Sequence, residues 1–121
     1  MEERKDLPCP KKQRMDDKLL AKVSNLADLV EYQEGSVVSR TIMDQKSGTV
    51  TLFAFDKGQG LSEHTAPFAA MLHVIAGKVK VAISGKSFEL SAGDAIIMPA
   101  NQPHALQATD RFKMMLVMIR G

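Results

Sequence analysis

The sequence has few of the side chains from which most metal and redox sites are built. Its 121 residues include one cysteine, Cys9, together with three histidines and no tryptophan. A single cysteine excludes an intrachain disulfide and a zinc site made of several thiolates. Any metal binding or acid–base chemistry therefore has to rely on histidine and carboxylate side chains.

Aromatic residues are scarce, and neither sign of charge is in large excess. Aromatics make up 5% of the chain, and 16 Lys and Arg residues nearly balance 14 Asp and Glu residues, which gives a net charge of +2. Proteins that bind nucleic acids more often gather basic residues on one face and add aromatic rings that stack on bases. We therefore expect no nucleic-acid partner.

Long apolar runs are missing as well. No segment approaches the ~20 apolar residues that a membrane-spanning helix needs, and the first six residues lack the apolar core of a signal peptide. These absences predict a cytoplasmic protein without a membrane partner. The 45% of hydrophobic and 25% of charged residues are typical of a globular chain, and the length suits one domain.

The first 18 residues are dense in charges of both signs and contain the interruption Pro8-Cys9-Pro10. Proline fixes the backbone angle φ and lacks a backbone N–H, so this segment is poorly suited to regular structure. We expect a flexible tail over residues 1–18, with Cys9 as an exposed thiol, and a single domain over residues 19–121.

Apolar residues recur with helical spacing over residues 16–30, and this pattern predicts a short helix. The pair Ser24-Asn25 offers an alternative reading of the same segment. In that reading this pair breaks the helix and caps a second turn that starts at Leu26.

The pattern becomes that of β-strands after Glu34. Segments rich in β-branched or apolar residues are separated by turn signals, and short strands at this spacing predict a sandwich or barrel. The run Met114–Ile119 is apolar on both faces, which indicates a central strand or one covered by another subunit. The predicted strands are Val37–Asp44, Thr49–Asp56, Met71–Ala76, Lys78–Ser84, Lys86–Leu90, Ala95–Pro99, His104–Ala108 and Phe112–Arg120.

Two segments with glycine and histidine at fixed spacing carry the strongest signal. The first has Gly58, His64, Ala70 and Gly77 in register, and the second has Gly93, Pro99, Asn101, His104 and Ala108. With these segments the sequence resembles the cupin superfamily, in particular its small single-domain, conserved-barrel members of the RmlC-like type. The resemblance covers roughly residues 35–119. It implies an all-β fold, a double-stranded β-helix or jelly-roll barrel, here with an N-terminal tail and short helix, and it implies a homodimer.

The resemblance also implies a metal site, whose four ligand positions fall on His64, Ala66, Ala70 and His104. Alanine has no donor atom, so half of the implied ligand set is missing. Two imidazoles would hold a divalent transition metal (Fe, Mn, Ni, Cu or Zn) only weakly, because catalytic zinc sites usually keep three protein ligands. Asn101 and Ala108 also depart from the second motif, where they replace a glycine and an asparagine.

Two further polar residues are candidates for ligand binding. Arg40 lies between apolar strand residues, and from inside the barrel it would clamp a carboxylate or phosphate. A solvated position, or an ion pair with Asp44 or Glu63, is the alternative. Glu63 would orient a ligand or act as a base beside His64, unless it lies on a surface turn. Strand parity directs His73 away from the expected site, and we expect it to be packed or at an interface.

Three functions are compatible with these residues. The first, which we favour, is a barrel that binds a small molecule, with or without a weakly held divalent metal, in a pocket containing His64 and His104. The second is a metal-dependent enzyme of the dioxygenase or isomerase type, in which the same residues hold the ion. The third is a metal-free acid–base isomerase with His64 or His104 as the base, which requires a carboxylate to orient the imidazole.

Overall fold

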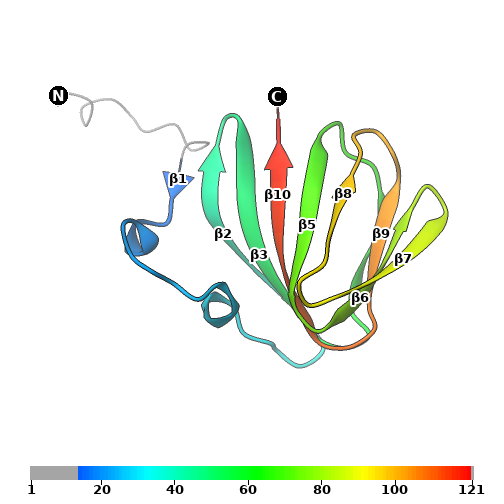
Figure 1. Ribbon diagram of the computed structural model, residues 1–121, viewed down its shortest axis with the longest axis horizontal. Helices are drawn as coiled ribbons and strands as arrows, with labels where there is room; N and C mark the ends of the chain where they lie inside the picture. Colours follow the sequence, from blue (N-terminus) through cyan, green and yellow to red (C-terminus); the bar gives the residue numbers. More distant parts are fainter. Residues whose placement is uncertain (1–13, 121) are drawn as a thin grey trace.

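The computed structural model describes residues 14–120, which form two antiparallel β-sheets with hardly any helix. The larger sheet has six strands in the order β1-β2-β3-β10-β5-β8, and the smaller has four in the order β4-β9-β6-β7. Figure 1 shows the strands of the larger sheet fanned side by side. The predicted all-β jelly-roll barrel is confirmed.

The strands are mostly short and begin or end at turn residues. Their bounds are β1 Arg14–Met15, β2 Val37–Gln45, β3 Gly48–Phe55, β4 Gly60–His64, β5 Ala69–Ala76, β6 Lys78–Ile83, β7 Lys86–Ser91, β8 Ala95–Met98, β9 His104–Ala108 and β10 Phe112–Ile119. Every strand that the sequence predicts is present, with small shifts at the ends. The prediction missed β1 and β4, because β1 is very short and β4 is polar and follows a glycine-rich turn.

The expected continuous helix over residues 16–30 is wrong. The segment instead contains two short 3₁₀ helices, η2 Asp17–Leu19 and η3 Leu26–Leu29. The side chain of Asn25 accepts a hydrogen bond from the backbone N–H of Ala27 at 3.0 Å, so the alternative with a capped second turn is the correct one. No helix within residues 14–120 has the length and apolar character needed to cross a membrane.

The N-terminal part of the described chain is attached to the larger sheet. Arg14 and Met15 pair with Asp44 and Met43 of β2, so regular structure starts before residue 19. Residues 1–13, which include Cys9 and most of the expected tail, lie outside the described residues.

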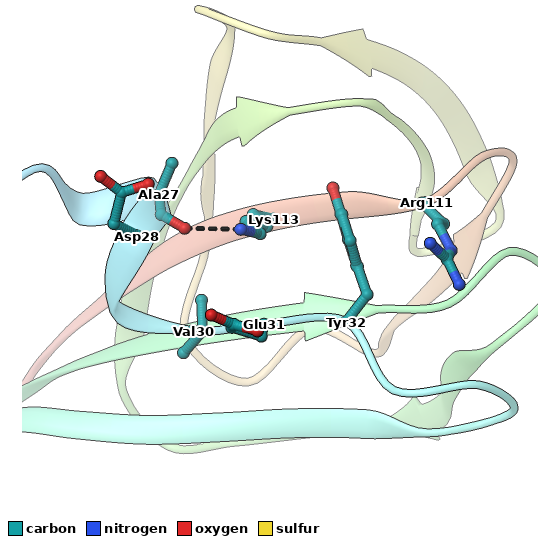
Figure 2. Close-up of a pocket in the computed structure, with 7 residues that line it drawn as sticks. All are labelled: Ala27, Asp28, Val30, Glu31, Tyr32, Arg111 and Lys113. Atoms are coloured by element: carbon teal, nitrogen blue, oxygen red, sulfur yellow. Dashed lines mark hydrogen bonds between the residues drawn. The ribbon is translucent and has the colours of Figure 1, made fainter.

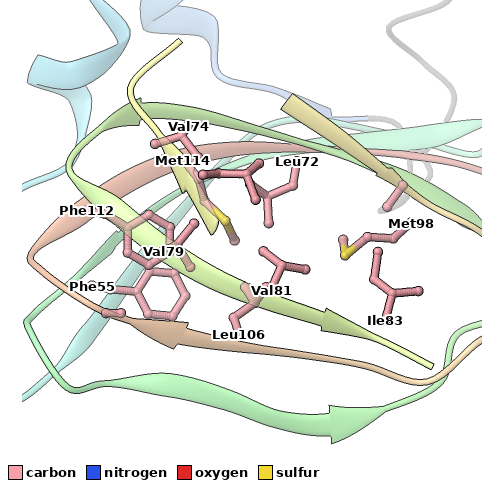
Figure 3. Packing of buried hydrophobic residues seen from close by; sticks show 13 residues of the cluster. Phe55, Leu72, Val74, Val79, Val81, Ile83, Met98, Leu106, Phe112 and Met114 are labelled. Atoms are coloured by element: carbon pink, nitrogen blue, oxygen red, sulfur yellow. The ribbon is translucent and has the colours of Figure 1, made fainter. Parts of the chain in front are cut away.

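The main core fills the space between the two sheets (Figure 3). Phe55 and Phe112 stack at one end with their ring centroids 4.5 Å apart, while Met98 and Ile83 lie at the other end. A second, smaller cluster lies on the outer face of the larger sheet. There Val30, from the segment after η3, covers Leu52 and Ala54 of β3. The barrel is therefore packed along most of its length.

Candidate functional site

A β-bulge in β4 brings His64 to the inner face of the barrel. Leu61 pairs with Leu106 and His64 pairs with His104, so three steps along β4 match two steps along β9. Without the extra residue, His64 would point to the face opposite Leu61, which packs against the core. The bulge therefore places His64 on the same side as His104.

His104 begins β9, and its inward direction follows from strand alternation. His104, Leu106 and Ala108 are all buried, whereas Gln107 between them is exposed. His104 is paired across the smaller sheet with Ile83 at the end of β6. His64, in contrast, is exposed on β4. The two imidazoles therefore lie where the apolar core meets the solvent.

The two imidazole rings are in direct contact. Their Nε2 atoms are 3.1 Å apart, and the rings meet edge to face with centroids 4.3 Å apart. Their other nitrogens face the backbone. Nδ1 of His64 lies 2.9 Å from the carbonyl oxygen of Ser62, and Nδ1 of His104 lies 3.2 Å from that of Gln102. Both rings are thus held from the rear by strand or loop backbone.

These contacts favour one tautomer in each ring. A carbonyl oxygen can only accept a hydrogen bond, so the Nδ1 atoms of His64 and His104 must donate to Ser62 and Gln102. In the neutral ring this leaves the Nε2 lone pair free. In this tautomer the two Nε2 atoms, 3.1 Å apart, are both available to bind a metal ion; in the other tautomer of one ring, its Nε2–H would donate to the second ring.

The separation of the nitrogens is also consistent with a shared metal ion. Bonds of ~2.0–2.1 Å from one ion to two imidazole nitrogens, at octahedral or tetrahedral angles, place the nitrogens about 2.8–3.4 Å apart. The observed 3.1 Å lies inside this interval. Imidazole nitrogen suits Zn, Cu, Ni and Fe, so the donor set of His64 and His104 fits a transition metal.

The two alanines at the implied ligand positions leave the rest of the site apolar. Ala70 is buried in the core and is paired with Met98 of β8 and Met118 of β10. Ala66 contributes its backbone instead, because its carbonyl oxygen accepts a 2.7 Å hydrogen bond from the N–H of Asn101. Within residues 14–120, no three His, Cys, Asp or Glu side chains gather closely enough to hold a metal.

The backbone conformation of Asn101 explains one departure from the cupin motif. Asn101 has a φ of 66°, a left-handed conformation that asparagine tolerates better than most residues other than glycine. Asparagine can therefore replace the glycine of the motif without loss of the turn. The loop is held at its other end by Ser84, whose hydroxyl donates to the side-chain oxygen of Gln102.

The other two predicted site residues do not join the pair. Glu63 is exposed on β4. Arg40 lies on the outer face of the larger sheet, opposite Leu52, and it binds Asp16 at 2.7 Å and the carbonyl oxygen of Leu29 at 3.2 Å. Its ion-pair partner is thus Asp16, and the hydrogen bond from Arg40 is the main cause that lowers the pKa of this carboxyl.

His73 lies apart from the other two histidines. Leu72 and Val74 beside it are fully buried in the core, so the side chain of His73 points to the outer face of the larger sheet. It is paired there with Met115 and Ala95. The parity argument from the sequence placed it in the same direction.

A hollow of about 400 Å³ that the sequence did not predict lies where the N-terminal segment meets β10 (Figure 2). The ring of Tyr32 stands between two cations, with Arg111 5.1 Å and Lys113 5.0 Å from its centroid. Lys113 also donates to the carbonyl oxygen of Ala27. Burial is the main cause that raises the pKa of Tyr32. These contacts attach the N-terminal segment to the larger sheet, and this structural role explains why Tyr32, Arg111 and Lys113 lie together.

Comparison with known proteins gives a consistent family. The family model of the cupin domain matches residues 51–120, more than half of the chain. A conserved protein of unknown function from Streptococcus pyogenes is 30% identical, with a TM-score of 0.84 over 93% of this chain and 98% of its own. A cupin 2 conserved barrel domain protein from Leptotrichia buccalis is 39% identical, with a TM-score of 0.78 over 80% of this chain and 47% of its own.

A third structure supports the fold alone. A cupin superfamily protein from Desulfitobacterium hafniense DCB-2 has a TM-score of 0.83 at 23% identity, over 89% of this chain and 99% of its own. No curated protein sequence gives a significant match. None of these three proteins is described with an activity.

Proposed function

The chain belongs to the cupin superfamily, and from that premise we propose that it is a binding barrel whose His64–His104 pair holds a small molecule together with a weakly bound divalent transition metal. One observation carries the proposal. The two Nε2 atoms lie 3.1 Å apart while both Nδ1 atoms face backbone carbonyl oxygens. A pair of nitrogens preset in this way binds a cation without having to choose a tautomer or rotate a ring.

Each side chain has a distinct part in this proposal. His64, the exposed member, faces an arriving ion, and the buried His104 fixes the depth at which the ion would sit. A bound transition metal would act as a Lewis acid toward a donor atom of the ligand. Positions that Ala66 and Ala70 leave without donors would be filled by water or by the ligand itself.

The surroundings of the pair indicate the class of ligand. Ile83 is paired with His104 and belongs to the same buried apolar cluster as Ala70 and Met98. A ligand that fits both parts has one anionic or metal-binding group, such as a carboxylate, attached to a small apolar body. The imidazoles would contact the polar group, and methionine, whose side chain adapts its shape, would contact the apolar body.

The experiment that tests the proposal is calorimetric titration of the demetallated protein with Zn²⁺, Ni²⁺ and Cu²⁺. We expect one site per chain. His64→Ala and His104→Ala should each weaken binding at least about 10-fold, since one imidazole alone is a poor chelate. His73→Ala is the matched control and should bind as the wild type does. Equal affinity in all four proteins would overturn the proposal.

Binding and catalysis can be separated with the same protein. A panel of small carboxylic acids, titrated with and without bound metal, should include compounds that bind and are recovered unchanged. Turnover that requires the metal would instead favour the enzyme reading of the same pair. The metal-free isomerase is less well supported, because within residues 14–120 the Nδ1 atoms of both imidazoles face backbone carbonyl oxygens and not a carboxylate that would orient the ring.

The other expectations from the sequence stay predictions. These are the cytoplasmic location, the lack of nucleic-acid and membrane partners, and the division into a tail over residues 1–18 and a domain over residues 19–121.

A further inference from the structure

The tip of the hairpin between β6 and β7 contacts the loop that leads into His104. Its turn consists of two residues, Ser84 and Gly85. The backbone N–H of Ser84 donates to the carbonyl oxygen of Pro103 at 2.8 Å, and the hydroxyl of Ser84 donates to the side-chain oxygen of Gln102 at 3.1 Å. One serine thus binds both of the residues that directly precede His104.

Ser84 has a backbone conformation that serine rarely adopts. Its φ is 50° and that of Gly85 is 83°, so both turn residues are left-handed. Hairpin turns of this kind usually have asparagine, aspartate or glycine at the first position. Within residues 14–120, the other non-glycine residues with a positive φ are Ala21 and Asn101. Two of the three therefore belong to the hairpin tip and the loop before His104, and such conformations gather at functional sites.

Three successive residues of this loop are bound to other parts of the barrel, namely Asn101, Gln102 and Pro103. The N–H of Asn101 donates at 2.7 Å to the carbonyl oxygen of Ala66, which lies two residues after His64. Ser84 binds the other two. The loop is therefore fastened on one side to the segment that follows β4 and on the other side to the hairpin tip.

The middle residue of the three orients His104. Nδ1 of His104 lies 3.2 Å from the carbonyl oxygen of Gln102. While this carbonyl stays in place, Nδ1 carries the proton, and the Nε2 lone pair lies 3.1 Å from Nε2 of His64. If the carbonyl moves away, the proton is free to shift to Nε2 and to be donated to His64. The ring of His104 then offers no Nε2 lone pair to a metal ion.

We propose that Ser84 is a positioning residue of the histidine pair, which acts through Gln102 to keep His104 in the tautomer with its Nε2 lone pair available. The choice of tautomer follows from the hydrogen bonds alone, whereas its consequence for metal affinity rests on the proposed function. Partners behind a metal-binding histidine commonly change metal affinity by about 10- to 100-fold. Because Ser84 acts one residue further back, we expect an effect at the lower end of this range.

The test is nitrogen-15 NMR of the metal-free protein at alkaline pH, where imidazoles are neutral. The chemical shifts of the two ring nitrogens report which of them carries the proton. Wild-type His104 should be protonated at Nδ1. Ser84→Gly removes the hydroxyl and suits the positive φ better than serine does, so the turn is retained. This variant should convert a measurable fraction of His104 to the Nε2–H tautomer and weaken Zn²⁺ binding about 10-fold.

A second variant and a control separate this role from a general loss of structure. Gln102→Ala removes the acceptor of the same hydrogen bond and should give the same change of tautomer. The double variant should show no more than either single one, because the hydroxyl of Ser84 acts through the side chain of Gln102. Ser87→Ala alters another exposed serine of the same hairpin and should match the wild type in both measurements.

The outcomes distinguish this proposal from the proposed function. Protonation of His104 at Nδ1 in Ser84→Gly and Gln102→Ala, as in the wild type, would overturn the positioning role, and so would a wild type with the proton on Nε2. A shift of the proton in both variants, in a protein that binds no Zn²⁺, would support the positioning role and overturn only the proposed function. Backbone amide spectra that match the wild type outside the hairpin tip and the loop establish that each variant is folded.

Discussion

The Nε2 atoms of His64 and His104 lie 3.1 Å apart, although the two residues are separated by 40 positions in the sequence. Two features produce this contact. The bulge between Leu61 and His64 turns one ring inward, and backbone carbonyls of Ser62 and Gln102 hold both rings by their Nδ1 protons. The pair is thus a property of the strand pairing of β4 and β9.

The first prediction concerns the bulge. Deletion of Glu63 removes the extra residue of β4, so that His64 should turn to the outer face of its sheet while His104 stays in place. Metal affinity measured by calorimetry should then fall to that of His64→Ala. Substitution Glu63→Ala keeps the bulge and should retain wild-type affinity. Full affinity in the deletion variant would show that the bulge does not position the ring.

The second prediction restores a missing ligand. Ala66→His adds an imidazole at the position where the resemblance to cupins implies one, and the side chain of residue 66 is only partly buried. A third nitrogen donor should tighten zinc binding by about 10- to 100-fold. Thr65→His adds the same group at the exposed neighbouring position and should have little effect. Equal gains from both substitutions would indicate adventitious binding.

The third prediction concerns acid stability and Asp56. The hydrogen bond from the Gly35 N–H, with further ones from Arg111 and Lys57, lowers the pKa of Asp56 to about 2. In the unfolded chain an aspartate has a pKa of ~3.9. The folded state therefore gains stability from this carboxylate above about pH 4, and loses it as the pH falls from about 4 towards 2.

Urea denaturation of Asp56→Asn at several pH values tests this linkage. The variant should be less stable than the wild type at pH 6, and its urea midpoint should fall less steeply between pH 5 and about pH 2.5. Asp17→Asn, which changes an exposed side chain, should keep the pH dependence of the wild type. A parallel course for all three proteins would rule out a role for the Asp56 hydrogen bonds.

The fourth prediction compares two glycines that share a φ of +83°. A Cβ atom at Gly77 would overlap the carbonyl oxygen of Arg111, whereas one at Gly85 would meet open space. Gly77→Ala should therefore destabilise the protein by about 3 kcal/mol or more, through backbone displacement in addition to the strained φ. Gly85→Ala carries the φ cost alone, about 1 kcal/mol. Similar losses in urea denaturation would contradict this distinction.

Sequence patterns were sufficient to predict most of the fold because they reflect local requirements. Strands such as Lys78–Ile83 alternate between exposed lysine and buried valine, and this period identifies a strand with one wet face. The glycine and histidine spacing then identified the family. The alternation also gave the direction of His73, whose pairing with Ala95 no bulge disturbs.

The features that sequence reasoning missed depend on tertiary contacts. The resemblance to cupins placed His64 at the site, but the bulge that turns it inward depends on one unpaired residue in a short polar strand, and no local pattern marks it. For Arg40 the sequence left open the barrel interior and an ion pair with Asp44 or Glu63, but its partner Asp16 belongs to a segment that folds back over the outer face. The cations that flank Tyr32 also meet it only because this segment crosses β10.

The most direct test of the central claim is anomalous X-ray diffraction at the zinc edge, from crystals of the protein grown with Zn²⁺. The account predicts one anomalous peak per chain at ~2.0–2.1 Å from Nε2 of both His64 and His104, with both Nδ1 atoms still facing backbone carbonyls. A map in which zinc is bound only elsewhere, or in which the two imidazoles stay metal-free at saturating Zn²⁺, would contradict it.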